Sequence, residues 1–287
     1  MTTAVQQMIE KYECKNTLEY KNALKEVIQE VALCGLSRAD FFSKVAFYGG
    51  TALRIFYGLD RFSEDMDFSL IKKDAAFVLD DYFSSLAEEL SANGFELSIE
   101  RKEKSIESNV QSAFIKGGTL VHLLKIAPVN QKILGVSDTE LIKIKFEIDT
   151  NPPDCAGFET KYSLLPFPYA VRLYDEPSLF AGKIHAVLCR SWKNRVKGRD
   201  FYDYLWYLGR RTKVNLPHLQ KRFEQSGKWN PDVDLTINEL KHLLRERFSA
   251  VDFAAAKADV LPFIKDGRNL DLWSKEFFSS LTESNLN

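Results

Sequence analysis

The spacing of apolar positions in the first hundred residues predicts alternating helices and strands. Between residues 16 and 36 apolar side chains recur at helical intervals, which predicts an amphipathic helix ending near Gly35. Residues 45–47 and 66–71 are short apolar runs typical of strands. Residues 74–92 are predicted to form a helix with Asp74 as its N-cap and a C-terminal glycine at position 94.

Farther along, the β pattern gives way to a helical one. Three β-like segments cover residues 95–101, 113–126 and 141–149, and the middle one is predicted to be a hairpin because Gly117-Gly118 separates two apolar runs. A proline-rich irregular stretch follows. After about residue 173 the predicted elements are all helices, at residues 178–192, 201–208, 216–225, 237–248 and 271–281. This order predicts an α+β fold, with a mixed-sheet core in residues 1–172 and a helical domain in residues 173–287.

A glycine turn, Gly49-Gly50-Thr51, joins the predicted strand 45–47 to a short helix that stops at Gly58. Glycines allow a ligand to approach the backbone closely, and the free N–H groups and dipole of a helix N-terminus favour a phosphate. The Thr51 hydroxyl can add one more hydrogen bond. An ordinary turn without a ligand is the alternative interpretation.

Two carboxylates, Asp65 and Asp67, lie at the start of the predicted strand 66–71. Residues two apart on a strand point to the same side, so these side chains converge and repel one another unless a cation lies between them. Oxygen ligands suit Mg²⁺ or Mn²⁺, and Mg²⁺ is typically held by one or two carboxylates together with substrate phosphates. A nucleoside triphosphate is the corresponding substrate, although a solvated surface pair would give the same pattern.

A third carboxylate is expected from the segment 141–149, which alternates between apolar and charged positions. Glu147 is the first candidate for this ligand, and Asp149 remains an alternative. Taken alone, this segment favours a half-buried strand with a solvated charged face.

Composition narrows the class of protein. The 287 residues are 45% hydrophobic, which excludes a disordered chain, and 39 basic against 40 acidic residues exclude a uniformly basic nucleic-acid coat protein. Four dispersed cysteines form no C-x-x-C pair, which excludes a zinc ribbon and favours a reducing compartment. With no signal-peptide core and no run of about 18 apolar residues, a cytoplasmic protein without membrane contact is expected.

Charge is nevertheless concentrated locally. Residues 183–213 contain nine basic and two acidic residues, a net of +7, interleaved with six aromatic residues. Such a segment can bind an RNA backbone and stack an unpaired base. A solvated charged face with aromatic residues in a helical core is the alternative.

Together these motifs resemble the AbiEii/AbiGii nucleotidyltransferase toxin family, which includes the MenT toxins. The similarity covers about residues 40–210 and includes Gly-Gly-Thr, the Arg-Phe-Ser-Glu-Asp-Met-Asp-Phe run at 61–68, and distal motifs at 181–186 and 197–203. It implies a polymerase-β-like core followed by a helical region, and a toxin that arrests growth, often by adding nucleotides to tRNA 3′ ends, and is opposed by a cognate antitoxin. The family's Gly-Ser turn falls on Gly50-Thr51, its metal pair on Asp65 and Asp67, and its lysine and later aspartate on Lys183 and Asp200.

The distal motif residues also suit this chemistry. A lysine at position 183 can neutralise phosphate charge as pyrophosphate leaves, and Asp200 with Asp203 can orient that lysine or approach the nucleotide. A surface lysine and a braced helix are the alternatives. His185 follows Lys183 and is therefore a candidate for lining the site. The favoured interpretation is an ordinary helix histidine, either packed or exposed.

The leading hypothesis is a metal-dependent nucleotidyltransferase in which Glu147 helps deprotonate the acceptor hydroxyl. The nearest alternative uses the same core on a small molecule or a protein. A glycosyltransferase is disfavoured because only 64 residues precede Asp65, and a haloacid-dehalogenase phosphatase because polar residues precede that aspartate. A non-catalytic binding module is the remaining class.

Overall fold

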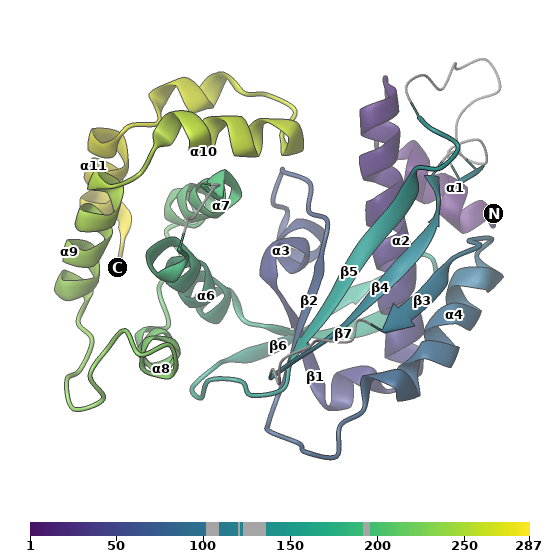
Figure 1. The fold of residues 1–287 in the computed structure, drawn as a ribbon, viewed down its shortest axis with the longest axis horizontal. Helices are drawn as coiled ribbons and strands as arrows, with labels where there is room; N and C mark the ends of the chain where they lie inside the picture. The colour runs from purple at the N-terminus through teal and green to yellow at the C-terminus, as the bar shows by residue number, and fades with distance from the viewer. Residues whose placement is uncertain (102–108, 120, 123–135, 192–195) are drawn as a thin grey trace. The chain divides into compact units, whose positions relative to one another are not determined.

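The structure is a computed structural model that describes residues 1–101, 109–119, 121–122, 136–191 and 196–287 (Figure 1). It divides into two compact units. Unit 1 contains residues 1–56, 62–152 and 160–173, and unit 2 contains residues 57–61, 153–159 and 174–287. The chain therefore enters unit 2 twice for short excursions before it remains there from residue 174 to its end.

Unit 1 is built on a mixed β-sheet whose strand order is β3-β4-β5-β2-β1-β7-β6. Strands β2 and β5 are parallel, as are β1 and β7, whereas β1–β2, β3–β4 and β4–β5 are antiparallel. The strands are β1 (Val45–Tyr48), β2 (Met66–Leu70), β3 (Ser98–Arg101), β4 (Val110–Gly118), β5 (Leu141–Asp149), β6 (Phe158–Ser163) and β7 (Tyr169–Tyr174). A mixed sheet with flanking helices confirms the predicted fold class.

The helices with described bounds in this part of the chain include α1 (Thr3–Glu10), α2 (Thr17–Arg38), α3 (Gly49–Tyr57) and α4 (Phe83–Ala92). Helix α2 contacts α1, α4 and β5, and runs along the sheet in Figure 1. Beneath it, the apolar positions of the central strands form an aromatic core in which the rings of Phe68 and Phe146 stack at 4.5 Å. This packing fixes β2 and β5, the two strands that carry the predicted carboxylates.

Unit 2 is helical, with α6 (Glu176–Cys189), α7 (Gly198–Gly209), α8 (Leu216–Gln225), α9 (Ile237–Ser249), α10 (Phe253–Val260) and α11 (Lys275–Asn285). Helix α6 contacts α7, α8 and α9. Aromatic side chains fill the space between the helices, for example Phe180 stacked on Tyr207 at 4.4 Å and Phe201 edge-on to Phe278 at 5.7 Å. Within the described residues, no helix of either unit is both long and apolar enough to span a membrane.

The predicted hairpin at 113–126 is wrong. Gly117 and Gly118 are the last residues of β4, and Thr119, Val121 and His122 are helical, while residue 120 and residues 123–126 lie outside the described residues. Gly117 serves packing and not a turn, because a Cβ at this position would lie 2.9 Å from the carbonyl oxygen of Glu96.

Two predicted helix boundaries also differ from the structure. Helix α2 continues through Gly35 to Arg38, and a Cβ on Gly35 would lie 2.7 Å from the Cβ of Glu89, so this glycine lets α4 approach α2. Helix α4 begins at Phe83 and not at Asp74, whose carboxylate instead accepts a hydrogen bond from the amide of Ala76 in a turn. Its C-terminal glycine, at position 94, has the expected positive φ of 86°.

Four of the helices and strands have no counterpart in the prediction: α1, β6, β7 and α10. Strands β6 and β7 lie in the proline-rich stretch described above as irregular, and β6 has no fully buried position. The remaining strands and helices agree with the predicted elements to within a few residues, and β5 and α8 match their predicted bounds.

Candidate active site

Gly49 begins α3 directly after β1, and its backbone needs a glycine for two reasons. Its φ of 83° is in the left-handed region, which disfavours a side chain, and a Cβ would collide with Oδ2 of Asp67. The carboxylate of Asp67 therefore lies against the first residue of α3. Because the first N–H groups of a helix have no partner within the helix, this end of α3 also offers donors to a phosphate.

Thr51, the third residue of α3, is fully buried, and its hydroxyl donates a hydrogen bond to the backbone carbonyl of Asp65. The hydroxyl is thus committed within the protein, which differs from the expected contact between this group and a phosphate. Only the backbone N–H of Thr51 remains in the predicted role. The hydroxyl instead links the glycine turn to the residue that precedes β2.

The sheet brings Asp67 and Glu147 side by side. They are register partners on the parallel strands β2 and β5, so their side chains extend from the same face. Asp149 is the register partner of Ser69, two residues farther along both strands. Of the two candidates for the third carboxylate, Glu147 therefore has the position next to Asp67.

The carboxylate of Glu147 has protein partners on two sides. It forms an ion pair with Lys145 at 2.6 Å and accepts a hydrogen bond from Ser112 at 3.1 Å. Ser112 is also its register partner, on the adjacent strand β4. Glu147 is about a quarter exposed and can exchange these partners for a ligand.

The carboxylates at this site suit a divalent metal ion whose remaining ligands come from the substrate. Asp65 is exposed and Asp67 is half-buried beside the start of α3. Across the described residues, no three carboxylate, imidazole or thiol groups stand close enough to hold a metal without further ligands. Two carboxylates completed by phosphate oxygens and water are a usual Mg²⁺ environment, so Asp65 and Asp67 fit such an ion and Glu147 would join it after moving away from Lys145.

Lys183 and Asp200, the distal candidates, belong to unit 2, and there they form one ionic cluster. The ammonium group of Lys183 on α6 lies 2.8 Å from Asp200 and 2.7 Å from Asp203, both on α7. Asp203 also receives two hydrogen bonds of 2.6 Å from the fork of Arg61, and Asp200 pairs with Arg190. We call these five residues the Lys183 cluster.

The Lys183 cluster is largely buried and carries excess positive charge. Arg61 and Asp203 are 3% and 0% exposed. Burial opposes the charge on Asp200, but Lys183 and Arg190 outweigh this effect and hold the pKa of the carboxyl below its ordinary value. Burial likewise opposes the charge on Arg61, and Asp203 outweighs it and raises the pKa of the guanidinium. With three cations and two anions, the cluster suits contact with an anion.

The basic segment 183–213 is less available to RNA than its charge indicates. Lys183 and Arg190 are paired within the cluster, Arg210 is paired with Glu176, and Arg199 stacks on the ring of Phe263. The aromatic residues Phe201, Tyr204 and Tyr207 are fully buried in the helical core. Tyr202 and Trp206 line a cavity of about 340 Å³, and Trp192, Lys193 and Arg195 lie outside the described residues.

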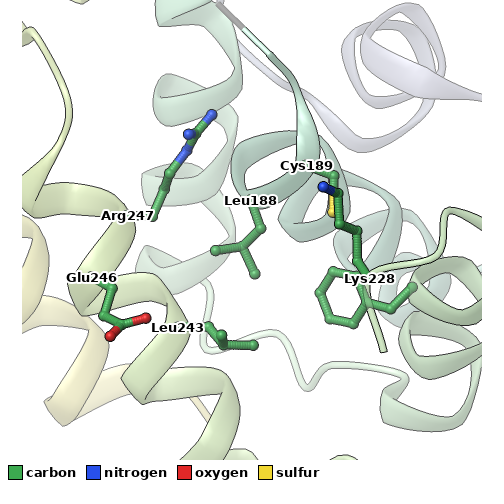
Figure 2. Close-up of a pocket in the computed structure, with 7 residues that line it drawn as sticks. Leu188, Cys189, Lys228, Leu243, Glu246 and Arg247 are labelled. Atoms are coloured by element: carbon green, nitrogen blue, oxygen red, sulfur yellow. The ribbon is translucent and has the colours of Figure 1, made fainter. Parts of the chain in front are cut away.

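His185 has a packing role. Its Nε2 lies 3.0 Å from the Ser226 hydroxyl, its ring packs on Phe223, and burial together with the charge of Arg222 lowers its pKa to about 4. Nearby in unit 2 is a cavity of about 230 Å³, and Figure 2 shows seven of the side chains that line it. None of the predicted site residues lines this cavity.

The sequence did not predict the buried ion pair of Arg61 with Asp203, and it indicated no role for Gln29. Arg61 was part of a quoted motif, but a buried ion pair across 142 positions has no local signal in the sequence. Gln29 lies in the middle of a helical pattern and contacts the segment before Asp65. The contacts of both residues become visible only in the tertiary structure.

The site thus has a helix that begins at a glycine turn, with a carboxylate from the adjacent strand packed against that turn. The chain belongs to the AbiEii family of nucleotidyl transferase toxins of type IV toxin–antitoxin systems, whose model matches residues 31–278. It is accordingly a nucleotidyltransferase, with a nucleoside triphosphate as substrate and an antitoxin as partner.

Two solved structures from Helicobacter pylori are similar to this chain. JHP933 is 15% identical, with 91% of this chain and 89% of the other covered and a TM-score of 0.46. A putative nucleotidyltransferase is 16% identical, with 91% and 92% covered and a TM-score of 0.45. None of the curated proteins compared with the chain matches it.

Proposed function

We propose that the chain transfers a nucleoside monophosphate from a nucleoside triphosphate to the 3′ end of a tRNA, with Mg²⁺ or Mn²⁺ as cofactor, and thereby arrests growth. The observation that carries the chemistry is the position of Asp67, which lies against Gly49 at the start of α3 and beside Glu147 on the sheet. A carboxylate so close to a phosphate-binding helix end requires a cation between the two anions. The choice of tRNA rests on the resemblance to the family.

In this proposal each residue has a separate task. The N–H groups of Gly49, Gly50 and Thr51 hold the triphosphate. Asp65 and Asp67 would hold the metal ion, which would supply Lewis-acid chemistry to the reaction. Glu147 accepts the proton of the acceptor hydroxyl. That hydroxyl oxygen forms a bond to the α-phosphorus as the bond to pyrophosphate breaks.

Lys183 is proposed to neutralise the charge that develops on the departing pyrophosphate, and Asp200 to hold this lysine in position. The support is the ion pair of 2.8 Å between them and the excess of cations in the Lys183 cluster. A compact ammonium group held by carboxylates is suited to this role because its direction is fixed before substrate binds.

The direct test incubates the purified chain with Mg²⁺, each labelled nucleoside triphosphate in turn, and total tRNA. Label is expected on the tRNA, and Asp67→Ala is expected to abolish it. Labelling of a protein or small molecule instead of tRNA would reject the RNA acceptor and retain the transferase chemistry. In cells, growth arrest by Lys183→Ala equal to that of the unaltered chain would refute a catalytic origin of toxicity.

A matched pair of variants tests the third carboxylate. Glu147→Gln is expected to reduce turnover by about a hundredfold or more, as removal of a general base does, while Asp149→Asn on the same strand changes it by less than about fivefold. The reverse order would assign the role to Asp149.

A further inference from the structure

Asp65 is carried by a short non-strand segment, residues 62–65, that leads into β2. We call it the Asp65 segment. Such a segment has no strand neighbour to fix its backbone, yet a metal ligand must be held to within about half an ångström of its working position. The contacts of the segment therefore decide how well Asp65 is prepared for a metal.

Three consecutive carbonyl groups of this segment accept hydrogen bonds from buried side chains. The amide nitrogen of Gln29 on α2 donates to the carbonyls of Ser63 at 3.2 Å and Glu64 at 3.0 Å. The hydroxyl of Thr51 on α3 donates to the carbonyl of Asp65. Gln29 and Thr51 are both 0% exposed, so water does not compete for these bonds.

A fourth contact holds the side chain next to Asp65. Lys25, one helical turn before Gln29 on α2, pairs with the carboxylate of Glu64 at 3.0 Å. Since successive carbonyls of an extended strand point to opposite sides, a single amide nitrogen that bonds both Ser63 and Glu64 indicates a turned backbone at these residues. At the end of the segment the Asp65 side chain is exposed, and Met66, the next residue, is buried.

From these contacts we infer that Gln29 and Thr51 are positioning residues that hold the Asp65 segment in the conformation that binds the metal. The inference rests on the proposed role of Asp65 as a metal ligand. Gln29 lies before residue 31, where the family match begins. The hydroxyl of Thr51 acts on the Asp65 carbonyl, and only the backbone N–H of Thr51 is assigned to the substrate.

The test measures Mn²⁺ binding to the full chain by electron paramagnetic resonance of the unbound ion, without nucleotide. Gln29→Leu and Thr51→Val remove the donors and keep the side-chain size, and each is expected to weaken Mn²⁺ binding about tenfold, the effect of one or two lost hydrogen bonds. Thr51→Ser keeps the hydroxyl and is expected to bind within twofold of the unaltered chain.

Ser37→Ala is the matched control, because Ser37 is also on α2 and also donates to a backbone carbonyl, that of Ala170 at 2.8 Å. It is expected to leave Mn²⁺ binding unchanged. Hydrogen exchange at the amides of residues 63–66 provides a second readout and should accelerate in Gln29→Leu and Thr51→Val but not in Ser37→Ala. If Thr51→Val does not fold, Gln29→Leu decides the question alone.

Asp65→Ala distinguishes the metal role of Asp65 from the positioning role of Gln29 and Thr51. If it abolishes Mn²⁺ binding while Gln29→Leu and Thr51→Val bind like the unaltered chain, the positioning role is refuted and the metal role of Asp65 stands. If Asp65→Ala leaves Mn²⁺ binding unchanged, the proposed metal site itself is wrong, and the positioning role falls with it. If Thr51→Val raises the KM for the nucleotide and leaves Mn²⁺ binding unchanged, the Thr51 hydroxyl contacts the phosphate and the positioning role of Thr51 is refuted.

Discussion

The Asp65 segment in unit 1 and the Lys183 cluster in unit 2 hold their candidate site residues by different forces. Gln29 and Thr51 fix the Asp65 segment through neutral hydrogen bonds to its backbone, so the carboxylate itself remains exposed. Lys183 is fixed through its own charge by Asp200 and Asp203. The supports of Asp65 act on its backbone, whereas Lys183 shares its charge with its supports.

The two kinds of contact also differ in how much their loss lowers the free energy of unfolding. Neutral hydrogen bonds contribute modestly to stability, about 1 kcal/mol each, but a buried ion pair leaves a strongly destabilising charge when one partner is removed. We therefore expect variants of the Lys183 cluster to affect folding, and variants of the Asp65 segment to affect mainly the site.

The largest effect on stability is expected from Arg61→Met. Asp203, which is 0% exposed, would lose both hydrogen bonds from the guanidinium fork and retain its ion pair with Lys183. We expect a loss of about 3–5 kcal/mol in the free energy of unfolding, measured by urea titration. The double variant Arg61→Met/Asp203→Leu should recover most of it, and a double variant as unstable as the single one would contradict the role of the buried charge.

An intermediate effect is expected from a buried carboxyl group in unit 1. Burial, with the nearby charge of Glu26, raises the pKa of Glu30 from 4.5 to about 7. The folded state thus retains a proton that the unfolded state releases between these values, and stability should fall as the pH rises from 4.5 to 7, by about 3 kcal/mol in total. Glu30→Gln should remove this part of the pH dependence in denaturant titrations, while Glu88→Gln, at an exposed position on α4, should retain it.

The smallest effect on stability is expected from Gln29→Leu. The substitution loses two hydrogen bonds, but it also removes a buried amide oxygen, Oε1, that has no hydrogen-bond partner among the described residues. Leaving such an atom unpaired costs about 1–3 kcal/mol, similar to the contribution of the two bonds. We expect a change of less than about 1 kcal/mol in urea titration, and a loss as large as that of Arg61→Met would remove the contrast between the two regions.

The fold was predictable from the sequence wherever one pattern dominated. Strand β5 alternates without interruption between apolar and charged residues, and α8 has both a clear start and a clear end, so both match the prediction. Two of the errors arise where a glycine serves packing. Gly35 and Gly117 were interpreted as breaks because a sequence does not show that Glu89 or Glu96 approaches the backbone there.

Of the candidate site, the sequence predicted residue types and spacing but not the partners of each side chain. The register of β2 and β5 selects Glu147 over Asp149 as the neighbour of Asp67, and register depends on pairing between segments 80 positions apart. The hydroxyl of Thr51 has the same uncertainty, since a threonine at a helix start can donate to a ligand or to its own protein. The metal and catalytic roles themselves stay predictions until the variants above are measured.

The excursion of residues 57–61 into unit 2 has a consequence for modular exchange between related proteins. This pentapeptide lies in the sequence between the glycine turn and Asp65, yet its Arg61 pairs with Asp203, far along the chain. A chimera joined near residue 173 would combine an Arg61 from one parent with an Asp203 from another. Such an exchange preserves the buried pair only when the first parent supplies Arg61 and the second supplies Asp203, although each unit is compact by itself.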